Sequence, residues 1–472
     1  MTLESNGRLS RTIGWRTAAA VVIANMIGTG IFTTSGFIAR DTGSPWILLT
    51  LWVVGGLIAL AGALAYAELG AAMPEAGGEY IFLREAYGPV VAYLSGWTSF
   101  FAGFGGAIAA ALLAFAGYIS SLFPALGEID ARLLAITTLW MLTAVHLGGV
   151  RLSGKLQGLL AAVTVMMMVA FIISGFAFGH GAVAHFRSSA APQGSMAVSL
   201  IFVLYAYSGW NAAAYLGGEI VEPEHGLPRA LIVGTACVGG LYVALNALYV
   251  WALPISEMSG VMAIAERAAV SMFGPRASRI VAALIALAIL SSASAMVVAG
   301  PRVYFAMARD GVFPRAFAIT QGRSGPTAAV ILQSAWASVL ILAFAVFERI
   351  VVYAGVAITI FSAATVAAVI VIRMQQPRAA RPFMMPGYPW AALAYVAICA
   401  WIITYAALTR FAETILGLAT VLGGLPIYWL LSLGAKDSPQ SSGGSRFRLR
   451  APSAARRRLR SRLRRIIGRN FI

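Results

Sequence analysis

Long apolar stretches alternate with short polar connections along most of the chain. A helix needs about 20 apolar residues to cross the hydrocarbon core of a bilayer, and twelve stretches are long enough to be candidates. They lie near residues 15–39, 46–71, 90–121, 132–149, 156–178, 196–220, 229–253, 279–307, 327–347, 350–372, 389–409 and 412–433. The third and eighth are long for one crossing, so we expect tilt or an interfacial extension there. The pattern predicts an all-α integral membrane protein with 12 transmembrane helices.

The composition excludes a soluble fold of this size. Of the 472 residues, 60% are hydrophobic and only 11% are charged, whereas soluble domains carry about 25% charged residues. The N-terminal segment has no short apolar core followed by a small-residue cleavage site, so we expect the first span to remain in the protein. Cys237 and Cys399 both lie within apolar stretches. This position predicts buried thiols, with neither a disulfide nor a metal site.

The basic residues predict the orientation in the membrane. If the N-terminus is cytoplasmic, 14 of the 34 Lys and Arg residues lie on the cytoplasmic side before the C-terminal tail, and eight lie on the other side. The remaining 12 lie in the tail, which an even number of spans also leaves in the cytoplasm. This asymmetry satisfies the positive-inside rule. We therefore expect a multi-pass protein of the plasma membrane or bacterial inner membrane, with both termini cytoplasmic.

The tail, residues 434–472, holds most of the excess positive charge of the chain. Within its segment Ala454–Ile467, arginines surround four apolar residues on one helical face, Leu459, Leu463, Ile466 and Ile467. One interpretation is an amphipathic helix that lies on anionic lipid of the inner leaflet. The other is a disordered basic tail that only enforces topology. We do not expect the arginine run of a twelve-span protein to bind nucleic acid.

Two of the apolar spans are interrupted near their midpoints. Gly28, Thr29 and Gly30 lie in the middle of the first span, and Ser208 and Gly209 lie in the middle of the sixth. Glycine lowers helix stability by about 1 kcal/mol, and a broken backbone survives in lipid only where it packs inside protein or lines a cavity. Corresponding breaks in two halves of a membrane protein indicate the substrate site of a secondary transporter.

The breaks also predict the domain organisation. A short cytoplasmic N-terminus, 1–14, precedes a transporter domain, 15–433. Within that domain, each break falls in the first helix of a five-helix half, about 15–195 and 196–385. The last two helices are an addition to these halves. This is the organisation of an inverted-repeat transporter.

A broken helix can bind a zwitterion with its backbone, which avoids placing full side-chain charges in the membrane. We expect the N–H groups of Thr29, Gly30 and Ile31 to bind a carboxylate at a helix N-terminus, where Gly28 and Gly30 allow close approach. We expect carbonyl groups to accept from the ammonium at residues Ala24 to Ile27, Tyr205, Ala206 and Ser208. The alternative for the glycines is close helix packing. The amide of Asn211 can bridge the two breaks or reach the substrate through water, or it can form an ordinary hydrogen bond between helices.

Five segments, in order along the chain, carry a resemblance to a known family. They read NMIGTGIF, MPEAGGEYIFLREAYGP, LYAYSGWNAAAYLGGEIVEPEHGLPRAL, RVYFAMARDGVFP and RPFMMPGYP. The chain resembles the amino acid–polyamine–organocation superfamily, and within it the L-type amino acid transporters and their bacterial relatives. The resemblance implies a LeuT-type 5+5 inverted repeat with broken helices 1 and 6, alternating access, and amino acids as substrates. It also implies that Tyr205 is an aromatic gate over the substrate; packing between helices is the alternative.

The spans that form the pocket in this family, the first, third, sixth and tenth, contain no charged residue near mid-membrane. A cationic side chain would need a partner there, so we expect neutral amino acids as substrates. Many relatives carry a coupling lysine in the fifth span, but that position falls close to Thr164 here. Hydroxyl groups of Thr164, Ser291, Ser292 and Ser294 could instead bind sodium, or they simply pack between helices. Exchange and facilitated diffusion remain open, and we expect no cofactor.

Charged residues near the predicted cytoplasmic ends of spans have two interpretations. Glu68 and Glu219 can form a proton relay or salt bridges with loop arginines. Arg302, Arg309 and Asp310 can form an inner gate or anchor their loop.

Other classes of function find less support in the sequence. The four histidines are scattered, and no HExxH or GxSxG motif is present, so we do not expect an enzyme. The loop from Phe123 to Asp130 contains no cysteine, so the disulfide-linked subunit of mammalian L-type relatives is not implied. A membrane amino acid sensor or scaffold on a transporter fold is the alternative function.

Overall fold

A computed structural model of the chain describes residues 11–74, 77–147, 154–309, 311–314, 317 and 327–434. Within these residues the fold is helical, and the one isolated β-bridge joins Ile13 to Ile220. Nine of the described helices are long and apolar enough to cross a membrane, or ten if one bent pair is counted as a single span. The predicted tail helix at 454–467 lies outside the described residues.

The first half of the chain folds into eight α-helices with three short helical connections. The elements are α1 (Trp15–Met26), α2 (Thr29–Thr42), α3 (Pro45–Ala72), α4 (Glu79–Tyr87), α5 (Pro89–Thr98), η1 (Ser99–Phe104), α6 (Gly105–Leu122), η2 (Pro124–Glu128), α7 (Ala131–Leu147), α8 (Gly154–Phe178) and η3 (Val183–Arg187).

The second half begins with a short helix and ends with two adjacent spans. Its elements are α9 (Met196–Tyr207), η4 (Ala212–Leu216), α10 (Pro223–Ala252), α11 (Ile255–Met258), α12 (Ile264–Arg309), α13 (Thr327–Phe344), α14 (Phe347–Gln375), α15 (Trp390–Thr409) and α16 (Phe411–Gly434). Each of the twelve predicted stretches falls on helix. Two of these helical stretches, in α7 and α8, are shorter than the other spans, so twelve crossings remain a prediction.

The helices at the two stretches predicted to be long are irregular, the first within the stretch and the second just before it. The third stretch runs through α5, the π-helical segment η1 and α6 without a break in the chain of helical turns. In α12, Gly274 has φ 79° and ψ 175°, so its backbone leaves the helical conformation there. Glycine tolerates this positive φ without a Cβ penalty. The segment before Gly274 is therefore a separate helix that precedes the span.

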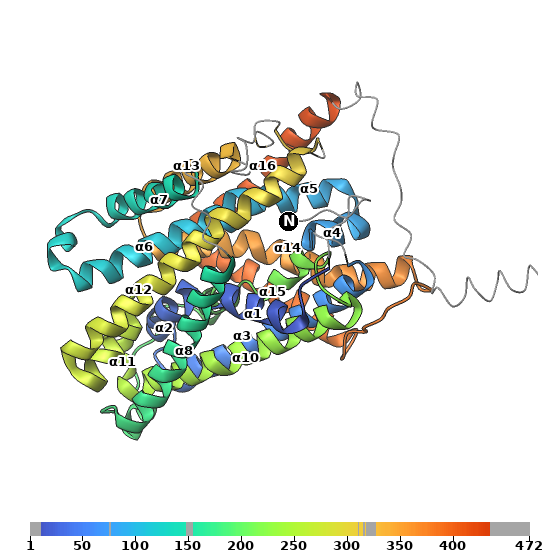
Figure 1. The fold of residues 1–472 in the computed structure, drawn as a ribbon. Helices are drawn as coiled ribbons and strands as arrows, with labels where there is room; N and C mark the ends of the chain where they lie inside the picture. The colour runs from blue at the N-terminus through green and yellow to red at the C-terminus, as the bar shows by residue number, and fades with distance from the viewer. Residues whose placement is uncertain are drawn as a thin grey trace, which may run out of the picture.

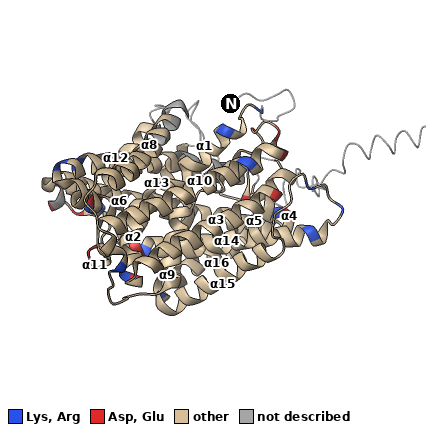
Figure 2. Cartoon of the chain, turned by 90° about the horizontal axis from the view of Figure 1, so that it is seen from below, with Lys and Arg blue, Asp and Glu red and all other residues tan. Residues whose placement is uncertain are grey.

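The helices form one bundle, and charged residues lie toward its two ends. Figure 1 shows α4 and α11 at opposite ends of the bundle, and we refer to these as the α4 end and the α11 end. Figure 2 shows few charged residues in the middle of the bundle. This distribution is the one expected of helices that cross a bilayer, because a charge at the bilayer centre is costly.

The centre of the bundle is built on close helix contacts. Helix α3 packs along α10, α1 packs on α10, and α2 packs on α9. A Cβ placed on Gly234 of α10 would lie 2.8 Å from Val22 of α1, so glycine permits the two backbones to approach. The broken elements α1, α2 and α9 therefore lie against the long helices α3 and α10.

The two cysteines differ in burial. Cys399 on α15 is buried, as expected, but Cys237 on α10 is exposed. The prediction of a buried thiol is therefore wrong for Cys237. An apolar span in a membrane protein can face lipid as easily as other helices, so hydropathy alone does not identify which face is buried.

Candidate functional site

The first helix break lies between α1 and α2. Helix α1 ends at Met26, and α2 begins at Thr29. The two residues between them, Ile27 and Gly28, have non-helical backbone angles. The two helices are bent by 43° at this break. Thr29 and Gly30, which the sequence places within the break, belong to the first turn of α2.

The N-terminus of α2 offers backbone donors at this break. Its N-cap residue is Gly28, and no side chain caps the helix. The first N–H groups of a helix have no intrahelical acceptor, which includes those of Thr29, Gly30 and Ile31. With the positive end of the helix dipole behind them, such groups form a site for a carboxylate.

The second break follows α9. The helix ends at Tyr207, Gly209 has φ 96°, and a 3-10 helix, η4, begins at Ala212. A Cβ on Gly209 would lie 2.6 Å from the carbonyl oxygen of Asn25 in α1. Both the positive φ and this contact require glycine. The break in the α9 region therefore packs directly on the end of α1.

The two breaks contact each other through residues predicted for the site. The hydroxyl groups of Thr29 and Tyr205, which are 176 positions apart, lie 3.2 Å from each other. A Cβ on Gly30 would lie 2.4 Å from Cα of Ala206. Tyr205 also packs edge-on against Phe347 of α14, with ring centroids 6.0 Å apart. The structure thus brings these predicted residues of the two breaks together.

Tyr242 of α10 links the two breaks and was not predicted from the sequence. Its hydroxyl donates to the carbonyl of Met26, at 2.5 Å, and lies 3.2 Å from the carbonyl of Ala206. Both carbonyls lie near the ends of broken helices. The available signal was a tyrosine within an apolar span, because a buried phenol usually finds a hydrogen-bond partner.

Exposure changes sharply across the site. Thr29, Gly30, Ile31, Tyr205 and Ala206 are buried. Ile27 is also buried. Among the other predicted substrate residues, Ala24, Gly28 and Asn211 are partly buried. Ser208 is exposed, and so is Asn25 at the end of α1. The Asn211 amide donates to the hydroxyl of Tyr215 at 3.4 Å. The predicted site therefore has one closed side and one open side.

The hydroxyl residues considered for sodium lie in three different surroundings. Thr164 and Ser291 line one small cavity of about 10 Å³ between α8 and α12. Ser292 faces the first break, since a Cβ on Gly28 would lie 3.3 Å from its Oγ. Ser294 Oγ lies 2.9 Å from Nε2 of His146. Of the four residues, Ser292 is the one placed beside the break.

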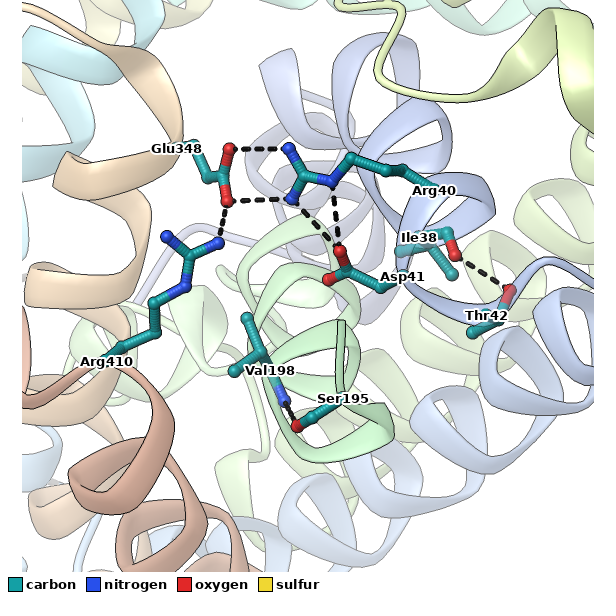
Figure 3. Close-up of polar contacts among 8 residues, drawn as sticks. All are labelled: Ile38, Arg40, Asp41, Thr42, Ser195, Val198, Glu348 and Arg410. Atoms are coloured by element: carbon teal, nitrogen blue, oxygen red, sulfur yellow. Dashed lines mark hydrogen bonds and ion pairs between the residues drawn. The ribbon is translucent and has the colours of Figure 1, made fainter. Parts of the chain in front are cut away.

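A cluster of four charged residues lies close to the α11 end, and we call it the Glu348 cluster. Arg40 of α2 binds both carboxylate oxygens of Glu348 in α14, at 3.1 and 2.9 Å (Figure 3). Arg40 also donates to Asp41, and Arg410 donates to Glu348. Beneath the cluster, Phe37 packs on Phe347 with ring centroids 6.0 Å apart. The sequence analysis did not single out these residues.

A second cluster lies near the α4 end, and we call it the Glu68 cluster. Glu68 of α3 accepts two hydrogen bonds from Arg373 of α14, at 2.8 and 2.7 Å, and lies 3.7 Å from Arg381. It also accepts from the backbone N–H of Met385 at 2.7 Å. Arg373 in turn covers the ring of Tyr388 at 3.7 Å. Of the two interpretations of Glu68, the structure contains the ion pairs with arginines.

The contacts described for Glu219 are hydrogen bonds of its backbone. Its carbonyl accepts from the N–H groups of Thr12 and Ile13, both at 2.9 Å. This contact ties the segment before α1 to the segment after η4. Within the described part of the chain, the Glu219 side chain forms no salt bridge. The side chains of Arg302 and Arg309, and all of Asp310, lie outside the described residues.

Comparisons with known proteins show similarity over most of the chain. The amino acid permease family model matches residues 13–426. The large neutral amino acids transporter small subunit 2 of Mus musculus is 28% identical over 438 residues, covering 89% of this chain and 81% of that protein. The b(0,+)-type amino acid transporter 1 of Mus musculus is 29% identical, covering 80% and 79%. The serine/threonine exchanger SteT of Bacillus subtilis (strain 168) is 28% identical, covering 91% and 98%.

Proposed function

The chain belongs to the amino acid permease family, and from this premise we propose that it exchanges neutral L-amino acids across the membrane by alternating access. It is a multi-pass membrane protein that acts in amino acid transport and not as an enzyme. The proposal adds the substrate class, the mode of transport and the site. The observation that carries it is the uncapped N-terminus of α2, which lies against the break after α9.

We place the substrate at these breaks because they supply complementary backbone groups. The N–H groups at the start of α2 suit the carboxylate, and carbonyl groups at the end of α1 suit the ammonium. Tyr205 lies beside this position, and its hydroxyl is already within 3.2 Å of Thr29. We propose that this contact opens when the substrate enters and that the Tyr205 ring then covers the substrate.

Two observations favour a neutral side chain and exchange. The residues at the two breaks, 24–31 and 205–211, include no Asp, Glu, Lys or Arg. A charged substrate side chain near these residues would remain unpaired, which is costly in a membrane. The names of two relatives refer to large neutral amino acids and to serine/threonine exchange. We extend these properties to this chain as part of the proposal.

The two broken helices also support a proposal for the fold and for the conformation of the protein. We assign α1 with α2 as the first transmembrane helix of a LeuT-type 5+5 inverted repeat, and α9 with η4 as the sixth of twelve. The Glu348 cluster and the Phe37–Phe347 contact cover α2 at the α11 end. Asn25 and Ser208 are exposed on the other side of the break. We propose that the described conformation is closed at the α11 end and that the α4 end faces the cytoplasm.

The experiment measures radiolabelled neutral amino acid uptake into proteoliposomes, with and without amino acid inside. We expect saturable uptake that requires internal amino acid. In Gly30→Ala, the new Cβ would lie 2.4 Å from Ala206, so α2 and α9 must separate. We expect uptake to fall at least about tenfold, which is the effect of roughly 1.4 kcal/mol on a rate.

Gly240→Ala is the matched control, because a Cβ on Gly240 in α10 meets open space. It should transport at the wild-type rate. Both variants are compared after confirming equal reconstitution and a single monodisperse peak in detergent. Normal uptake by Gly30→Ala would contradict the proposed site. Uptake that does not depend on internal amino acid would contradict exchange.

A further inference from the structure

Glu79 is a carboxylate outside the described ion-pair clusters, and it joins two transmembrane spans. It is the first residue of α4, which lies between the spans formed by α3 and α5. Its Oε2 accepts from the hydroxyl of Tyr66 in α3 at 2.9 Å. Its Oε1 accepts from the hydroxyl of Ser95 in α5 at 2.9 Å. Each oxygen is therefore held by a different span.

Among the described residues, the groups that face Glu79 from neighbouring elements are neutral. Tyr66 donates to it from α3, and the phenols of Tyr215 in η4 and Tyr395 in α15 are close enough for its charge to affect them. Among the described residues, no lysine, arginine or histidine forms an ion pair with Glu79. A carboxylate placed among phenols and hydroxyl groups lacks a compensating positive charge.

The other charged residues that the structure describes near α4 have other partners or face outward. Arg84 is exposed and lies over the ring of Tyr80 at 5.6 Å. Glu85 accepts from Gln376 at 2.7 Å. On α14, which also packs on α4, Arg373 binds Glu68. On α5, the phenol of Tyr93 packs among the rings of Trp97, Phe313 and Tyr428.

Burial of this carboxylate favours its protonated form. Desolvation raises the pKa of Glu79 above its ordinary value, and the hydrogen bonds from Tyr66 and Ser95 oppose part of that rise. The residue as a whole is partly exposed, while hydrogen bonds from two spans hold both of its carboxyl oxygens. Glu79 therefore favours the neutral form while these spans enclose its carboxyl group.

Glu79 is also connected to the second helix break. The ring of Tyr66 meets the ring of Trp210 edge-on, with centroids 4.7 Å apart. A Cβ on Gly78, the residue before Glu79, would lie 3.0 Å from the ring of Tyr215 in η4. Movement of the segment around Trp210 and η4 must therefore disturb the surroundings of the carboxyl group.

We propose that Glu79 is a proton-binding site that is occupied while α3, α5 and η4 enclose it and that releases its proton when these elements separate. This inference rests on the transport function proposed above and adds a proton to its regulation. In the enclosed conformation the carboxyl binds a proton more tightly than in a hydrated one. Acid on the α4 side therefore stabilises the enclosed conformation. Because the exchange cycle includes opening of this conformation, acid slows exchange.

The experiment follows exchange in proteoliposomes of known orientation, at constant external pH, while the pH on the α4 side is varied from about 5 to about 8. We expect the wild-type exchange rate to fall severalfold as the pH is lowered. The decrease can reach at most about tenfold for each unit by which the pKa of Glu79 differs between the two conformations. Glu79→Gln removes the titrating group and should give a flat profile. Glu85→Gln, on the same helix, should keep the wild-type profile.

The outcomes separate this inference from the transport proposal. Absence of exchange in the wild type at neutral pH would contradict the transport function itself. Normal exchange with no dependence on pH, or an unchanged profile in Glu79→Gln, would contradict the proton site alone.

If Glu79→Gln does not fold, Tyr66→Phe and Ser95→Ala provide the test. Each removes one donor to the carboxylate, which raises the Glu79 pKa further, so the midpoint of the profile should move to higher pH. A midpoint that stays in place in both variants would overturn the inference.

Discussion

The Glu348 cluster and the Glu68 cluster have the same chemistry at opposite ends of α14. Each places one glutamate between two arginines, Arg40 and Arg410 in the first and Arg373 and Arg381 in the second. Their surroundings differ. The Glu68 side chain is 3% exposed and Glu348 is 11% exposed. Glu68 also binds a backbone N–H group, whereas Glu348 binds only side chains within the described part of the chain.

The elements that the clusters connect explain this difference. The Glu68 cluster ties α3 and α14, two continuous helices, to the segment around Met385. The Glu348 cluster ties α14 to α2, which is one half of a broken helix. A half-helix can move without bending a whole span. The comparison therefore indicates that the Glu68 cluster fixes the scaffold, and that the Glu348 cluster holds a movable element in its closed position.

The largest effect is expected from Glu68→Gln. The substitution leaves Arg373, whose side chain is 15% exposed, without its carboxylate near the α4 end. Breaking a buried ion pair costs about 3–5 kcal/mol, and the partial exposure of Arg373 places the expected cost toward the lower end of that range. Thermal unfolding in detergent, followed by intrinsic fluorescence, should show a large loss of stability. A variant as stable as the wild type would remove the distinction between the two clusters.

Glu348→Gln should have an intermediate effect, and on conformation more than on stability. It weakens the charge-assisted hydrogen bonds from Arg40 and Arg410, which are worth about 1.5–3 kcal/mol. Opening at the α11 end is measured by thiol labelling of Phe37→Cys, because Phe37 is buried beneath the cluster. We expect severalfold faster labelling when Glu348→Gln is added. Equal rates with and without it would show that the cluster does not hold α2 closed.

Tyr242→Phe tests the connection between the two helix breaks. The variant loses a hydroxyl that reaches the carbonyl groups of Met26 and Ala206. Hydrogen bonds within membranes average about 0.6 kcal/mol. The two carbonyl groups share one O–H donor, so its loss should cost about that much. We expect a small loss of stability and a clear change in exchange rate. A loss of stability with normal exchange would make Tyr242 a packing residue.

Arg267→Ala should have the smallest effect and calibrates the others. Arg267 and Glu257 form a salt bridge at 3.2 Å, and both side chains are about half exposed. Exposed pairs of this kind contribute about 0–1 kcal/mol. Thermal unfolding should shift little, and transport should stay normal. A shift as large as that of Glu68→Gln would mean that burial does not determine the strength of these pairs.

The sequence was informative where local chemistry determined the structure. Glycines within an apolar span predicted the break, and the structure places it at Ile27 and Gly28, one residue from the expected position. By contrast, the pairing of Arg40 with Glu348 spans 308 positions. No local pattern relates them, because their contact depends on how α2 and α14 pack. The same holds for the hydroxyl residues considered for sodium: the sequence left a sodium site and simple helix packing as alternatives, and it gave no sign of the contact between Ser294 and His146.

The placement of the two cysteines has a practical consequence for spectroscopy. Cys399 is buried, and Cys237 lies near the middle of α10, on a face that we expect to contact lipid. Charged, water-soluble maleimides do not enter the hydrocarbon core readily, so we expect the native chain to give little background in aqueous labelling. Reporter cysteines can then be introduced in pairs across α2 and α14 without first removing native ones. Distances between spin labels at such pairs would follow the motion of α2 directly in the bilayer.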